Sequence, residues 1–262
     1  MADGEDGANG KIIDKVREYK PDYVLWLADG TGFELRQETL AEIKKTSKVI
    51  GWFTDDEVRF DSYSKLWVPY LDYVVTGDIE AVPKYNELGA WATFGVCTCY
   101  PIERKFPPRE KYAVSFVGTA RADRGAWISY LRNIGIPLGL FGDVTHKEMT
   151  DIFWDSKINL NFSRTYDFKT LGMKARVFEV CLAGGFLLTQ DFPQVERYYE
   201  IGKEADVFRD KEEMVEKIAY YLNHPEKRRA IAEAGYKRAK RDYSSTAMVS
   251  RIMREIEGSQ VH

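Results

Sequence analysis

The chain has 262 residues, of which 44% are hydrophobic and 14% aromatic, enough for one large domain or two modest domains with buried cores. Its 38 basic and 41 acidic residues leave a formal net charge of -3, so no global field recruits nucleic acid or an anionic membrane. No apolar run reaches the roughly 20 residues that span a bilayer, and the acidic start does not resemble a signal peptide. We therefore expect a soluble cytoplasmic protein.

Cysteine and histidine give no sign of a metal centre. Cys97, Cys99 and Cys181 are too few for a disulfide framework, and Cys97-Thr-Cys99 lacks the two-residue gap of zinc knuckles. The three histidines show no ligand-like spacing. We expect reduced cysteines, no structural metal and no cofactor.

The first part of the chain alternates short apolar runs with helical periodicity. Its first ten residues, rich in Gly and Asp, are expected to be disordered. The apolar runs predict strands and the periodic segments predict helices between them. The expected strands are 23–28, 49–53, 73–76 and 92–96, and the expected helical segments are 11–19, 37–46, 62–69 and 79–88.

A proline-rich segment at 101–108 interrupts this rhythm and is the expected linker. It divides the chain into an N-terminal domain of residues 1–106 and a C-terminal domain of residues 107–262. The second domain repeats the alternation and ends in charged helices. Its expected strands are 113–117, 137–141, 157–161 and 186–189, and its expected helices are 123–133, 147–154, 174–183, 211–222, 225–242 and 245–255.

Strands that alternate with helices of this length are typical of parallel sheets with crossover connections. We therefore predict an α/β fold with two Rossmann-like domains that face each other across a cleft. In such folds the ligand binds at the carboxyl ends of the strands.

The segment from Lys174 to Thr189 combines two cations, a carboxylate and a glycine pair. Lys174 and Arg176 begin a predicted helix, Glu179 follows, and Gly184-Gly185 ends the helix before an apolar strand. A carboxylate can accept hydrogen bonds from the two hydroxyls of a ribose, while cations and free helix N–H groups can face phosphate oxygens. The pattern therefore suits a nucleoside diphosphate. The alternative is that Glu179 caps or pairs with a neighbouring Arg on an ordinary amphipathic helix.

The pattern Phe-Glu-x-x-x-x-Gly-Gly-Phe-Leu-Leu-Thr, residues 178–189, resembles the donor-site signature of GT-B glycosyltransferases, most closely the CgeB-like spore-maturation type. Three further segments match that family in the same order. They are Ile-Gly-Trp-Phe-Thr-Asp-Asp at 50–56, Val-Ser-Phe-Val-Gly-Thr at 114–119 followed by Arg124, and Ser-Lys-Ile-Asn-Leu-Asn-Phe-Ser at 156–163.

The resemblance implies transfer of a sugar from a nucleoside diphosphate-sugar, with a UDP-sugar as the expected donor, without a metal and with retention of anomeric configuration. It places the donor diphosphate at Gly118, Thr119 and Arg124. There the glycine permits close backbone approach, and the arginine can make a bidentate contact. The alternative is that Arg121 and Arg124 are solvated surface charges.

Two polar pairs of the sequence each have alternative roles. Asn159 and Asn161 share one face of a predicted strand, where they either hold neighbouring loops or reach the base or sugar of a ligand. Asp55 and Asp56 follow a strand of the first domain and are the candidate catalytic carboxylates, as an acceptor-side base or cation ligand. The alternative is that one of the two caps the next helix.

The sequence departs from the family in two respects. Full-length relatives begin with a strand and a glycine-rich turn that find no match here, so we expect a truncated N-terminal domain, which a homo-oligomer could complete. Better-known GT-B sequences have a second glutamate where this chain has Leu171. The alternatives are therefore a nucleotide- or sugar-binding module without turnover, and a nucleic-acid-base glycosyltransferase that uses the basic C-terminal helix. The acceptor, whether glycan, protein or base, is not identified.

Overall fold

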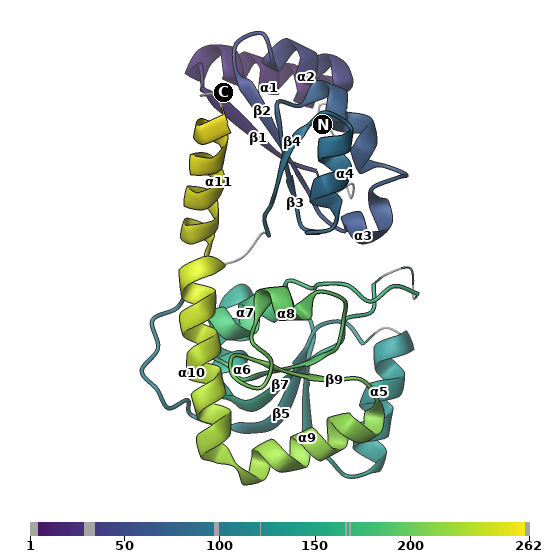
Figure 1. The fold of residues 1–262 in the computed structure, drawn as a ribbon, viewed down its shortest axis with the longest axis vertical. Coiled ribbons are helices and arrows are strands. Elements are labelled where there is room, and N and C mark those ends of the chain that lie inside the picture. Colours follow the sequence, from purple (N-terminus) through teal and green to yellow (C-terminus); the bar gives the residue numbers. More distant parts are fainter. Residues whose placement is uncertain are drawn as a thin grey trace. The chain divides into compact units, whose positions relative to one another are not determined.

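A computed structural model describes residues 5–28, 35–96, 100–120, 122–165, 167 and 169–259 (Figure 1). The chain forms two compact units, Met1–Val96 with Arg251–His262, and Cys97–Ser250. Each unit contains one parallel sheet with helical connections. The predicted α/β class is therefore confirmed. Of the residues named above, Cys97, Cys99 and Arg121 lie outside the described part of the chain.

The sheet of the first unit has the strand order β1-β2-β3-β4, in which every strand pairs with its successor in the chain. Its main core lies between this sheet and the connecting helices, and includes Phe53, Leu40, Ile43 and Tyr85. The elements are α1 (Glu5–Tyr19), β1 (Tyr23–Ala28), α2 (Gln37–Ile43), β2 (Lys48–Phe53), α3 (Asp56–Arg59), the 3-10 helix η1 (Ser64–Tyr70), β3 (Tyr73–Thr76), α4 (Ala81–Glu87) and β4 (Trp91–Phe94).

The end of the chain returns to this first unit. In helix α11 (Ser245–Ser259), Glu255 accepts a hydrogen bond from the Thr93 hydroxyl at 2.6 Å, and Arg251 donates to the same hydroxyl at 3.2 Å. A Cβ added at Gly95, just after β4, would lie 3.0 Å from Cδ1 of Ile252. The predicted assignment of all C-terminal residues to the second domain therefore needs correction from Arg251 onward, because these side chains bind β4.

The sheet of the second unit has the order β6-β5-β7-β8-β9 and is also parallel throughout. Its core joins Phe116 and Leu160 of the sheet to Leu131 and Ile218 of two helices on one face. The elements are β5 (Tyr112–Val117), α5 (Ala122–Asn133), β6 (Leu138–Phe141), α6 (His146–Asp155), β7 (Ser156–Asn161), α7 (Arg176–Leu182), β8 (Leu187–Gln190), α8 (Val195–Tyr198), β9 (Asp206–Phe208), α9 (Lys211–Asn223) and α10 (Pro225–Asp242).

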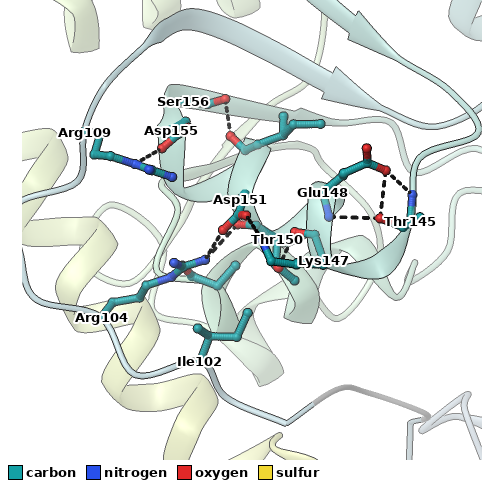
Figure 2. A network of polar contacts seen from close by, with 12 residues as sticks. Ile102, Arg104, Arg109, Thr145, Lys147, Glu148, Thr150, Asp151, Asp155 and Ser156 are labelled. Atoms are coloured by element: carbon teal, nitrogen blue, oxygen red, sulfur yellow. Dashed lines mark hydrogen bonds and ion pairs between the residues drawn. The ribbon is translucent and has the colours of Figure 1, made fainter.

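The proline-rich segment expected to be a linker is bound to the second unit (Figure 2). Arg104 donates from Nε to the Ala183 carbonyl at 3.3 Å and from Nη2 to the Thr150 carbonyl at 3.2 Å. Arg109 donates to Asp155 at 2.5 Å. The division between the units therefore falls after Val96 rather than at 106, because arginines that look like linker residues in the sequence satisfy carbonyls and carboxylates of the second unit.

Several short elements were not predicted. Strand β9 and helices α3 and α8 have three or four residues each, too short to show a period. Helix α1 begins at Glu5. The expected disorder of the first ten residues is therefore wrong from residue 5 onward. The structure contains no helix, within the residues it describes, whose length and apolar character would allow it to cross a bilayer.

Helix α10 approaches the loop before β9 so closely that only glycine fits. A Cβ added at Gly235 would lie 2.2 Å from the carbonyl oxygen of Glu204, whereas one added at Gly125 in α5 would meet nothing within 4 Å. Backbone cannot yield as a flexible side chain can. Gly235 therefore fixes the distance between this helix and the loop.

We predict that Gly235→Ala lowers the free energy of unfolding by about 1–3 kcal/mol, because the new methyl group displaces backbone. Gly125→Ala, the matched control in a helix of the same unit, should raise it by about 0.5–1 kcal/mol through loss of backbone freedom in the unfolded chain. Urea unfolding followed by circular dichroism measures both. If Gly235→Ala and Gly125→Ala changed the free energy of unfolding equally, the helix and the loop would lie farther apart at Gly235 in solution.

Candidate functional site

The candidate site lies in the second unit, where strands β5 and β7 end side by side. Helix α5, which follows β5, packs through Leu131 on one face of the sheet. On the opposite face, Asn159 donates to the Phe153 carbonyl of α6, and α7, which follows β7, contacts α6 through Arg176 and Met149. Chain segments that leave neighbouring parallel strands toward opposite faces open a crevice between them. A cavity of about 340 Å³ lies at this position. Its lining residues are Phe116, Val117, Gly118, Thr119, Arg124, Asn161, Lys174, Ala175, Arg176 and Glu179.

The turn after β5 forms one wall of the cavity. Gly118 has a φ of 144°, which favours glycine, and its N–H donates to the Phe141 carbonyl at 2.8 Å. Arg124 in the first turn of α5 donates to the Thr119 carbonyl at 3.3 Å. The structure thus places these three predicted residues together, with a guanidinium beside exposed loop backbone.

Helix α7 forms the opposite wall. It begins at Arg176, two residues later than the expected start at Lys174, which lies in the preceding loop. Glu179 falls in the first turn of the helix and pairs with Arg176. The ion-pair alternative for Glu179 therefore describes what is seen. The nucleotide interpretation stays a prediction, and the paired carboxylate lines the cavity in which it would apply.

Asn161 and Asn159 differ in role although they share a strand face. Asn159 is buried, accepts from the Ser115 hydroxyl at 2.9 Å and donates to the Phe153 carbonyl at 3.0 Å. Its polar atoms are therefore used within the unit. Asn161 donates to the Thr189 hydroxyl at 2.9 Å and lines the cavity at the end of β7.

The glycine pair lies outside the cavity lining, just beyond the C-terminal end of α7. Gly184 has a φ of 81°, and a Cβ there would lie 2.8 Å from the Trp154 ring. A Cβ at Gly185 would lie 2.6 Å from Nδ2 of Asn159. The donor-binding role expected for Gly184 and Gly185 is therefore corrected to a packing role, because their positions approach Trp154 and Asn159 and neither glycine lines the cavity.

The loop between β7 and α7 is a hairpin with its own hydrogen bonds. The Thr165 N–H donates to the Thr170 carbonyl at 2.9 Å, and the Gly172 N–H donates to the Ser163 carbonyl at 2.9 Å. Asp167 accepts hydrogen bonds from the Thr165 hydroxyl and from the backbone N–H groups of Thr170 and Lys169. The Thr165 hydroxyl first, and then these N–H groups, hold the pKa of Asp167 well below its usual range. The expected movement of this loop over a donor stays a prediction.

The candidate catalytic carboxylates lie in the first unit. Asp55 precedes α3 with a left-handed backbone, and its side chain makes no cap hydrogen bond. Asp56 is only 1% exposed and accepts from the hydroxyls of Thr76 at 2.6 Å and Tyr85 at 2.8 Å. A side chain enclosed in this way does not reach a substrate. The catalytic role expected for Asp56 is therefore corrected to a core hydrogen-bonding role, while that of Asp55 stays a prediction.

Sequence reasoning missed two contributors to the site. Met149 of α6 and the carbonyl of Val117 both contact the Arg176 side chain. A carbonyl has no sequence signal, because every residue has one, and Met149 looks like an ordinary core residue of an amphipathic helix. No group of three or more potential metal-ligating side chains occurs in the described ranges.

Two parallel-sheet units, one with a cationic cavity at the carboxyl ends of its strands, define the GT-B class of glycosyltransferase folds. The chain belongs to the glycosyl transferase-like family, whose model matches residues 109–254. No curated protein matches the sequence.

Solved structures of low sequence identity share the fold. HepE of Anabaena in complex with UDP-glucose has a TM-score of 0.66 at 10% identity, over 95% of this chain and 82% of that one. Sucrose-phosphate synthase of Thermosynechococcus elongatus has a TM-score of 0.63 at 8% identity, over 96% and 77%. The pneumococcal O-GlcNAc transferase GtfA in complex with UDP and GlcNAc has a TM-score of 0.62 at 12% identity, over 94% and 59%.

The surroundings of Asp56 predict a pH-dependent stability. Burial raises its pKa above the ordinary 3.8, against hydroxyls of Ser64, Thr76 and Tyr85 that lower it. The folded chain then binds this proton more tightly than the unfolded chain, so the group favours folding below pH 3.8 and loses this contribution as pH rises through the folded pKa. Neither Asp56 Oδ1 nor Ser64 Oγ has a hydrogen bond of normal geometry among the described residues.

We predict that Asp56→Asn raises the free energy of unfolding at pH 7 by about 1–2 kcal/mol, because a neutral amide keeps both hydroxyl contacts and can donate to Ser64. The gain should shrink toward pH 4. Asp61→Asn, whose carboxylate is 85% exposed, is the matched control and should change little. Thermal unfolding across this pH range measures the difference, and a loss of stability at pH 7 would show that the core requires the ionised carboxylate.

Proposed function

We propose that this protein transfers a sugar from a nucleoside diphosphate-sugar to an acceptor hydroxyl, with the donor bound in the cavity of the second unit. One observation carries the proposal. The cavity gathers Arg124, Lys174 and Arg176 around a single carboxylate, Glu179, at the carboxyl ends of β5 and β7. A net positive site with one acceptor for hydroxyl groups fits a diphosphate joined to a ribose.

In the reaction, the bond between the anomeric carbon and the diphosphate oxygen breaks, and its electron pair leaves with the diphosphate. The acceptor oxygen forms the new bond and releases its proton. Negative charge develops on the leaving phosphate oxygens, so cations fixed beside them stabilise the transition state more than the ground state. Arg124 and Lys174 are the proposed phosphate ligands. The backbone of Gly118 and Thr119 permits close approach, and Asn161 faces the sugar or base.

A UDP-sugar is the proposed donor, supported by HepE and GtfA, both solved with UDP. The CgeB-like branch, retention of configuration and independence of metal also remain proposals, and they rest on the resemblance of residues 178–189 and of the three other segments. A cytoplasmic location and a homo-oligomer are likewise expectations from the sequence.

The basic C-terminal helix gives no specific support to the nucleic-acid alternative. In α10, Arg228 and Arg229 bind Glu110, and Lys240 binds Glu103. Arg241 binds Asp242 at 2.7 Å. These carboxylates neutralise the cations that would otherwise contact phosphates. Nucleic-acid binding would also give an affinity that falls steeply with salt.

We predict that Glu179→Ala weakens UDP binding by about 10- to 100-fold, the value of a hydrogen bond to a charged group. Glu233→Gln is the matched control, since Glu233 also belongs to a helical ion pair, with Lys237, but does not line the cavity. Calorimetric titration with UDP measures both variants. Unchanged affinity in Glu179→Ala would remove this residue from the donor site.

Turnover is tested by release of UDP from UDP-glucose and UDP-N-acetylglucosamine, with and without sugar acceptors. We expect slow hydrolysis that depends on Glu179 and is stimulated by the correct acceptor. UDP binding without any release of product from either donor would favour a binding module without turnover. Leu171, in the place of a second glutamate, is the sequence feature that suggests this alternative. Absence of UDP binding would overturn the proposed function.

The phosphate contacts make a separate prediction. Lys174→Gln and Arg124→Gln should each weaken UDP by about 10-fold or more but leave the weak binding of uridine unchanged, because uridine has no phosphate. Titration of each variant with both ligands measures this. Equal losses for UDP and uridine would place these side chains away from the diphosphate.

A further inference from the structure

We infer that Arg176 is the residue through which this site selects ribose over deoxyribose. Its guanidinium holds the Glu179 carboxylate in place for the ribose hydroxyls and does not serve as a phosphate ligand. The inference rests on the proposed function, because it takes Glu179 as the partner of the donor ribose. It departs from the expectation that Arg176 faces phosphate.

The guanidinium of Arg176 is anchored by three contacts from two elements of the fold, β5 and α6. Its Nε donates to the carbonyl of Val117, the last residue of β5, at 3.2 Å. Its Nη1 contacts Sδ of Met149 in α6. The group also lies over the ring of Phe153, 5.7 Å from the ring centre. Because the strand carbonyl is fixed by the sheet, the position of the guanidinium is fixed as well.

The same Nη1 forms the ion pair with Oε2 of Glu179. The side chains are only 26% and 17% exposed, so solvent screens this pair less than a surface pair. Within the part of the chain that the structure describes, Oε1 of Glu179 has no hydrogen bond, and the residue lines the cavity. One carboxylate oxygen is therefore held by the protein while the other is available to a ligand.

This arrangement conflicts with a phosphate role for Arg176. The Val117, Met149 and Glu179 contacts use three of the five guanidinium N–H bonds. A swing toward a phosphate would leave the Val117 carbonyl and the Glu179 carboxylate without this partner in a partly buried site. Such a loss costs about 1–3 kcal/mol. Lys174 and Arg124 line the same cavity and are the better phosphate ligands.

A fixed carboxylate discriminates between sugars more strongly than a mobile one. A 2′-deoxyribose lacks one of the two adjacent hydroxyl groups, so one hydrogen bond that the Glu179 carboxylate would accept from the ribose is missing. A carboxylate held by Arg176 cannot turn to recover this hydrogen bond from water, whereas an untethered one can. Because Arg176 holds the Glu179 carboxylate in place, the absence of one ribose hydroxyl lowers the affinity for the nucleotide.

The experiment is calorimetric titration of UDP and 2′-deoxy-UDP into the wild type and three variants. The wild type should bind UDP about 10- to 100-fold more tightly than 2′-deoxy-UDP. Arg176→Gln should reduce this ratio to about 3-fold or less, chiefly through weaker UDP binding, because Glu179 is released. Lys174→Gln, the matched control cation of the same cavity, should weaken both nucleotides equally and keep the ratio.

Arg176→Lys separates positioning from charge. A lysine keeps the positive charge, but its compact ammonium cannot reproduce the fork that joins the Val117 carbonyl to Glu179. We therefore expect Arg176→Lys to reduce the preference for UDP over 2′-deoxy-UDP as much as Arg176→Gln does. Retention of the ratio in Arg176→Lys or Arg176→Gln would overturn the inference and indicate a phosphate or structural role. Thermal melts confirm that each variant is folded before titration.

Failure of the inference is distinguishable from failure of the proposed function. A wild type that discriminates between the two nucleotides, with a ratio that survives in Arg176→Gln, refutes the role of Arg176 alone. A wild type that binds both nucleotides equally refutes the ribose role of Glu179, and the inference with it. A wild type that binds neither refutes the donor site as a whole.

Discussion

The candidate site depends on one topological constraint, the departure of the chain toward opposite faces of the sheet after two neighbouring parallel strands. Strands β5 and β7 are paired, and the helix after β5 lies on the face opposite to that of Asn159. Helix α7, which follows β7, contacts α6 on the face of Asn159. Backbone therefore cannot fill the space beyond their carboxyl ends. Every cation of the cavity is carried by a segment that begins at this crevice, which is why charge gathers there.

Within this frame, the protein separates two electrostatic tasks. Arg124 and Lys174 come from the loop and helix start around the cavity, while Arg176 is engaged by a strand carbonyl, a methionine and a carboxylate. The contacts of Arg176 fix the geometry of Glu179, and Arg124 and Lys174 are the proposed phosphate ligands. The same logic explains the arginines of the proline-rich segment and of α10, whose charges are used by carbonyls and carboxylates of the second unit.

Most strands and helices were predictable because each carries its own period of apolar residues. All four strands of the first sheet lie within a few residues of their predicted positions, as does the helix at Pro225–Asp242. The division between units was not predictable in the same way, because the contacts of Arg104 and Arg251 join segments distant in sequence. A proline-rich composition reports local backbone preference and not the partners of the side chains within it.

The sequence by itself determined the α/β class and the residue types of a nucleotide site, because periodicity and residue chemistry are local properties. Only the tertiary structure decided which of these residues share a cavity. It placed Gly118, Arg124, Asn161, Lys174 and Glu179 together. It left Gly184 and Gly185 outside the cavity lining, and it buried Asp56 in the first unit. Such proximity depends on the order and direction of strands, which no single segment encodes.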